Sequence, residues 1–143
     1  MPLVHTLTIA LHILFAAAWF GMALAVPALT RAVVSGGTPG SKTISAMNVT
    51  VVLFYVFAFA NWMLGMQMGF REQYNAWPYH ASITLGLILV AVQLFLIRPS
   101  WNKLVGGDAE TGRKRLAMGT GIGHLVWLTI FVLMYVGRGV VAG

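Results

Sequence analysis

Four long apolar stretches dominate this sequence, and each is long enough to cross a membrane as a helix. They cover residues 3–29, 44–70, 77–97 and 116–136. A spanning helix needs about 20 mostly apolar residues, because the hydrocarbon core is about 30 Å thick. Of the 143 residues, 59% are hydrophobic and only 8% are charged, whereas soluble domains carry about a quarter charged residues. We therefore predict an all-α integral membrane protein that forms a four-helix bundle.

Polar segments separate the four stretches and mark the predicted loops. Residues 35–41 are rich in Gly, Ser and Pro, which favours a turn. Residues 71–76 form a short polar connection, and Pro78 suits the first turn of the helix that follows. Residues 98–115 form the longest and most charged predicted loop. The sequence shows no internal repeat, so we expect a single domain over residues 1–143.

Basic residues indicate how the predicted bundle is oriented. The loops after the first and third predicted helices contain Arg31, Lys42, Arg98, Lys103, Arg113, Lys114 and Arg115. The opposite side contains Arg71 and Arg138. Because cytoplasmic loops are rich in Lys and Arg, we predict a multi-pass protein of a bacterial inner membrane with both termini outside. Trp101 would lie in an inner aromatic belt. The net charge of +6 then reflects topology, and we expect no nucleic acid as a partner.

Histidines, and no carboxylates, fall within the predicted spans. The acidic residues Glu72, Asp108 and Glu110 all lie in predicted loops, which argues against a pump built on buried carboxylates. The histidines lie in or at the edge of the predicted helices: His5, His12, His80 and His124. An ionisable side chain inside a membrane is costly and suggests a function. The chain has no cysteine, which excludes iron–sulfur clusters and covalently attached c-type haem.

His12 and His124 are predicted to lie at similar depths near the bilayer centre. With a rise of about 1.5 Å per residue, His12 lies roughly 13 Å below the outer end of the first predicted helix. His124 lies roughly 12 Å above the inner end of the fourth. Imidazole is a good axial ligand for haem iron, and helix bundles hold cofactors between facing helices. We therefore predict a b-type haem between His12 and His124, with Trp19 packed against the porphyrin.

A second group of candidate ligands is predicted near the outer surface. His5 precedes His12 by seven residues and so shares its helix face, and His80 begins the third predicted helix at the same level. His5 and His80 could ligate a second haem. Together with Met63 and Met66 they could instead bind copper, because imidazole and thioether ligands suit Cu(I).

Each candidate residue also has a purely structural explanation. A buried histidine can simply hydrogen-bond between helices, methionine often fills gaps in a core, and Trp19 can be a packing residue. Gly119 and Gly123 form a pair of small residues that close helix packing explains without a cofactor. A structural subunit of a larger membrane complex, or a homo-oligomer, is therefore a further interpretation.

Part of the sequence resembles two known membrane protein families. Residues 12–21 read His-Ile-Leu-Phe-Ala-Ala-Ala-Trp-Phe-Gly. They resemble the first helix of the HemJ-type four-helix protoporphyrinogen oxidases and of the CopD copper-resistance membrane proteins. Arg31, and residues 77–80 with the sequence Trp-Pro-Tyr-His, are also similar to the oxidase family. The resemblance to the oxidases implies that His12 binds haem b.

Three functions are therefore expected. The main hypothesis is a membrane b-type haem protein with bis-histidine ligation that transfers electrons, with quinone or a redox protein as its partner. The first alternative, which the HemJ resemblance implies, is haem-dependent protoporphyrinogen oxidation. Residues 81–83, Ala-Ser-Ile, stand where that family has a Lys after the third-helix His, so haem binding is the stronger implication. The second alternative, which the CopD resemblance implies, is copper handling. The sequence identifies no catalytic residue.

Overall fold

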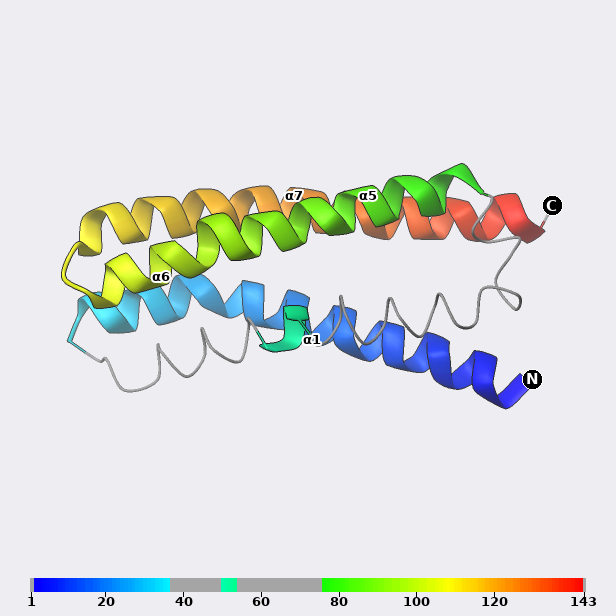
Figure 1. Cartoon of the computed structure of the whole chain (residues 1–143), viewed down its shortest axis with the longest axis horizontal. Helices are drawn as coiled ribbons and strands as arrows, with labels where there is room; N and C mark the ends of the chain where they lie inside the picture. Colours follow the sequence, from blue (N-terminus) through cyan, green and yellow to red (C-terminus); the bar gives the residue numbers. More distant parts are fainter. Residues whose placement is uncertain (1, 37–49, 54–75, 143) are drawn as a thin grey trace.

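The computed structural model describes residues 2–36, 50–53 and 76–142, and this part of the chain is helical with no β-strand. Its elements are α1 (Pro2–Val34), α5 (Trp77–Val92), the π-helix η3 (Gln93–Ile97), α6 (Arg98–Val105) and α7 (Ala109–Ala142) (Figure 1). Residues 50–53 are also helical. The all-α prediction is confirmed for the described residues. Most of the predicted second helix, residues 44–70, lies outside them, so the count of four helices stays a prediction.

Three helices are long and apolar enough to cross a membrane, among the residues that the structure describes. They cover Thr6–Val34, Trp77–Val105 and Ala109–Val141, with 29, 29 and 33 residues. The second of these is a continuous rod made of α5, η3 and α6, because the backbone at Gln93 and at Arg98 keeps right-handed helical angles. Pro78 lies in its first turn, as predicted.

The predicted loop over residues 98–115 is wrong. The rod continues as α6 to Val105, and α7 already begins at Ala109, so the connection is a tight turn. Gly107 adopts a φ of +108° in this turn, a conformation that glycine reaches without steric cost. Apart from Asp108, which lies in the turn, the charged residues of the predicted loop lie on helix ends that extend beyond the apolar stretches. Lys114 and Glu110, one turn apart at the start of α7, form an exposed ion pair of 2.8 Å.

The rod lies alongside α7, and both α1 and the rod run antiparallel to α7, so that both chain termini lie at the same end (Figure 1). Two buried apolar clusters hold these helices together. The first, at the end with the Gly107 turn, consists of Val26, Val33, Ile97, Trp101, Leu104 and Leu116. The second, further toward the termini, consists of Trp19, Val52 and Leu89. Val52 belongs to the short helical segment 50–53, which therefore packs on the same core.

Glycines of α7 allow this helix to approach the rod closely. A Cβ atom on Gly112 would lie 2.6 Å from the backbone nitrogen of Leu104, and one on Gly119 would lie 2.6 Å from Cδ1 of Ile97. A Cβ atom on Gly137 would lie 3.0 Å from the ring of Tyr79. Small residues at helix contacts are typical of membrane bundles, because lipid offers no hydrophobic driving force and packing must hold the helices.

Candidate functional site

Aromatic rings fill the contact between α1 and α7 near the middle of both helices. The ring centroids of Trp19 and Trp127 are 5.4 Å apart with an interplanar angle of 90°. Phe20 lies 6.0 Å from Trp127 and 5.8 Å from His124 in similar edge-on arrangements. Such edge-to-face geometry is favourable because the positive ring edge meets the negative ring face. Trp19, the predicted neighbour of a porphyrin, packs against a second indole, and its contact with a porphyrin stays a prediction.

The structure does not bring His12 and His124 to the same level. His124 contacts Phe20, which follows His12 by eight residues in α1. Eight residues correspond to about 12 Å along a helix axis. By this register the two imidazoles lie at different levels along the bundle. The haem predicted between them stays a prediction, and the register favours another partner for His12.

Two buried polar atoms on one face of α7 lack hydrogen-bond partners in the part of the chain that the structure describes. The Thr120 hydroxyl oxygen and Nε2 of His124 are buried and make no hydrogen bond with any residue that the structure describes. Thr120 and His124 are four residues apart and therefore lie on the same face of the helix. Leaving a buried polar atom unsatisfied costs about 1–3 kcal/mol. Such atoms call for an explanation, and an internal water or ligand is one.

The other candidate ligands lie toward the termini. His80 is an exposed residue in the first turn of α5, and its carbonyl oxygen accepts a 3.0 Å hydrogen bond from the Thr84 hydroxyl. His5 lies in the first turns of α1. Met63 and Met66 lie outside the described residues, so the predicted copper site stays a prediction. No group of three or more His, Cys, Asp or Glu side chains is gathered within residues 2–36, 50–53 and 76–142.

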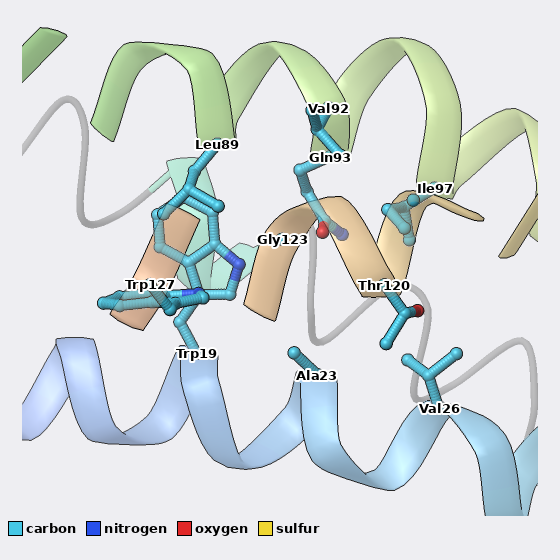
Figure 2. Close-up of a pocket in the computed structure, with 11 residues that line it drawn as sticks. Trp19, Ala23, Val26, Leu89, Val92, Gln93, Ile97, Thr120, Gly123 and Trp127 are labelled. Carbon is cyan, nitrogen blue, oxygen red and sulfur yellow. The ribbon is translucent and has the colours of Figure 1, made fainter. Parts of the chain in front are cut away.

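A small cavity lies where α1, α7 and the rod meet, beside the two indoles (Figure 2). Its volume is about 30 Å³. It is lined by Trp19, Ala23, Val26, Leu89, Val92, Gln93, Ile97, Gly119, Thr120, Gly123 and Trp127. Ligand pockets usually enclose about 300–1,000 Å³, so this cavity is far too small for a porphyrin.

Gln93 and Thr120 are site residues that sequence reasoning missed. Both are buried and both line the cavity. A signal was present, since Gln93 is an amide near the end of the third apolar stretch, and polar side chains inside a membrane are costly and often functional. Thr120 gave no comparable signal, because a helical threonine usually bonds to its own backbone.

Comparison of the chain with models of protein families, with curated proteins and with solved structures gives no match. The site therefore has to be interpreted from its own geometry and chemistry.

Proposed function

We propose that the chain is an integral membrane protein that binds one b-type haem in the outer half of its bundle and transfers electrons. His12 and His80 would hold the haem iron in this proposal. The observation that supports it is the register of the helices, by which the level of His12 is nearer to that of His80 than to that of His124. Three helices of sufficient length and apolarity support the membrane location.

The contacts of α7 give the level of each histidine. Trp19 packs on Trp127, and His12, seven residues before Trp19, lies about 10 Å closer to the termini. Gly137 follows Trp127 by ten residues, or about 15 Å, and it contacts the ring of Tyr79. His80 follows Tyr79 directly, so His12 and His80 differ in level by only about 3–5 Å.

Haem ligation by two imidazoles favours electron transfer over reactions at the metal, since it leaves no open coordination position. The haem supplies the redox chemistry, and the protein sets its ligation, dielectric and access. In this proposal His12 of α1 and His80 of α5, at a similar level along the bundle, would provide the two ligands. A quinone in the lipid or a redox protein at the outer surface would be the electron partner.

The test is an optical spectrum, oxidised and reduced, of protein purified from cells that make haem. We expect a low-spin haem spectrum whose reduced α-band is lost in His12→Ala and lost or shifted in His80→Ala. His124→Ala is the matched control, because its imidazole lies at another level, and it should keep the band. A colourless wild-type protein, or an α-band that survives in His12→Ala, would overturn the proposal.

The other expected functions rest on fewer described residues. Copper handling would use Met63 and Met66, which lie outside the described part of the chain. Protoporphyrinogen oxidation would require haem as well, so complementation of a strain lacking that activity separates it from electron transfer alone. Copper in the purified protein, without haem and lost on changing both methionines, would favour the copper function.

A further inference from the structure

The cavity beside Trp19 and Trp127 has a polar side within an apolar bundle. Gln93 is 6% exposed and Thr120 is 8% exposed, and both side chains line the cavity from opposite helices (Figure 2). The Thr120 hydroxyl oxygen has no hydrogen-bond partner among the described residues. The cavity is therefore lined mainly by apolar groups but offers polar groups to whatever occupies it.

The backbone of the rod changes its winding where Gln93 lies. Residues 93–97 form a single π-helical turn, in which the backbone N–H of Arg98 donates to the Gln93 carbonyl five residues earlier. Pro99 follows directly. Proline has no N–H, and its ring clashes with the carbonyl four residues before it. Membrane helices accommodate proline by local π-helical adjustments, and Pro99 thus accounts for the π-helical turn.

The π-helical turn keeps three buried residues on one face. Leu89, Gln93 and Ile97 are spaced by four residues, and all three line the cavity. In a regular α-helix each step of four residues rotates the side chain by about 40° beyond a full turn. The wider π-helical turn absorbs part of this rotation. The turn that precedes Pro99 therefore keeps Ile97 close to the face that Leu89 and Gln93 already share.

We propose that this cavity is a buried water site, in which one or two water molecules bridge the Gln93 amide and the Thr120 hydroxyl. One water needs about 10–15 Å³ of cavity volume measured this way, and the cavity offers about 30 Å³. Buried waters typically make two to four hydrogen bonds, whereas cavities that stay empty are lined by apolar groups alone. Here an amide and a hydroxyl provide the donors and acceptors.

Other occupants fit the cavity less well. A hard cation such as Ca²⁺ takes six to eight oxygen ligands, and the lining includes only two side chains that carry oxygen. A larger organic ligand exceeds the volume. His124 does not line the cavity, so the proposed water site is separate from it and independent of the proposed haem.

The first experiment detects the water directly. The full-length protein, labelled with ¹⁵N at glutamine and embedded in lipid bilayers, is examined by water-edited solid-state NMR. Gln93→Leu assigns the side-chain signal. We expect the Gln93 amide to receive magnetisation from water much faster than buried leucine methyl groups do. Transfer as slow as for those methyl groups would show a dry cavity and overturn the proposal.

The second experiment uses a matched pair of glycine substitutions on α7. A Cβ atom on Gly123 would meet only Leu89, at 3.9 Å, and so would enter the cavity, whereas a Cβ atom on Gly121 would meet nothing within 4 Å. Both changes to Ala should raise helix propensity equally. If water fills the cavity, Gly123→Ala should displace it and lower the folding equilibrium constant roughly tenfold relative to Gly121→Ala.

The same pair is then measured with both polar groups removed. In a Gln93→Leu, Thr120→Val background no polar group remains to hold water, so Gly123→Ala should become at least as stabilising as Gly121→Ala. A Gly123→Ala variant that is already as stable as Gly121→Ala in the wild-type background would overturn the proposal. The proposal would also be overturned if Gly123→Ala remained less stable than Gly121→Ala by the same amount after both polar groups had been removed, because the loss would then be steric.

Discussion

Gly112 is the residue at which α7 approaches the rod most closely at the Gly107 end. A Cβ atom there would lie within 2.9 Å of the backbone nitrogen, Cα and Cβ of Leu104, and backbone atoms cannot move aside as a flexible side chain can. We expect Gly112→Ala to destabilise the protein by about 1–3 kcal/mol, as overpacking usually does. Chemical or thermal unfolding in detergent micelles measures this.

Gly86 provides the control for Gly112. A Cβ atom on Gly86, within α5, would meet nothing within 4 Å, so Gly86→Ala should be neutral or stabilise by up to about 1 kcal/mol through helix propensity. Equal stabilities of the two variants would mean that α6 and α7 do not pack as closely as the structure shows.

Trp101 and Trp77 form a second contrast between single residues. Trp101 is 2% exposed within the first apolar cluster, whereas Trp77 is 61% exposed at the start of α5. We expect Trp101→Ala to cost about 3–5 kcal/mol, as for other buried tryptophans, and Trp77→Ala to cost less than about 1 kcal/mol. Unfolding midpoints of the two variants decide this, and similar losses would contradict the assigned burial.

Trp101 also shows a limit of sequence interpretation. Its position beside basic residues predicted an aromatic belt at the membrane surface, yet its indole is buried between helices. Hydropathy reports how polar a segment is, but it does not report which face of that segment meets another helix. That face depends on the neighbouring helix, here the start of α7.

At the scale of the elements, the largest difference from the sequence prediction is α6, a helix where a loop was predicted. A helix there gives its residues alternating environments, since Ser100, Trp101 and Leu104 are buried while Asn102 is exposed. The chain lacks cysteine, so single cysteines can be introduced without background. We expect a thiol reagent to label Asn102→Cys quickly and to label Ser100→Cys and Leu104→Cys at least tenfold more slowly, because only exposed thiolates react readily.

Uniformly fast labelling along residues 98–105 would instead indicate the loop that the sequence predicted.

The apolar stretches themselves were predictable, because about 20 consecutive apolar residues have few alternatives to a spanning helix. The helix ends were not predictable from hydropathy, since α6 and the first turns of α7 carry charged residues that a helix end tolerates in water. The π-helical turn was also missed, because sequence shows Pro99 but not how the backbone accommodates it.

At the scale of the whole molecule, the relative register of the helices decides which histidines can act together. The prediction of a common level for His12 and His124 assumed that each helix begins at a membrane surface. Instead α1 has 33 residues and α7 has 34, so each is about 50 Å long and exceeds the hydrocarbon core of about 30 Å. The depth of a residue counted from a predicted helix end therefore does not give its level relative to a residue of the partner helix. Side chains that pack on each other, such as Trp19 and Trp127, do give the relative level of the two helices.

The distribution of charge over the molecule leads to the last prediction, which concerns its orientation. Within the described residues, one end of the bundle carries Arg31, Arg98, Lys103, Arg113, Lys114 and Arg115. The end with the termini carries Arg138 (Figure 1). Since basic residues near span ends are retained in the cytoplasm, we expect the Gly107 turn to be cytoplasmic. An impermeant thiol reagent should label Glu110→Cys only in inverted vesicles and Val140→Cys only in intact spheroplasts.

Neutralising part of this charge tests whether the basic residues cause the expected orientation. Changing Arg113, Lys114 and Arg115 together to Gln removes half of the six described basic residues at that end, and we expect a measurable fraction of Glu110→Cys chains to become labelled in spheroplasts. Arg138→Gln is the control, because it increases the asymmetry and should leave the labelling pattern unchanged. If the triple change has no effect while expression is retained, features other than these three charges orient the protein, and the segments beyond the described residues become the place to look.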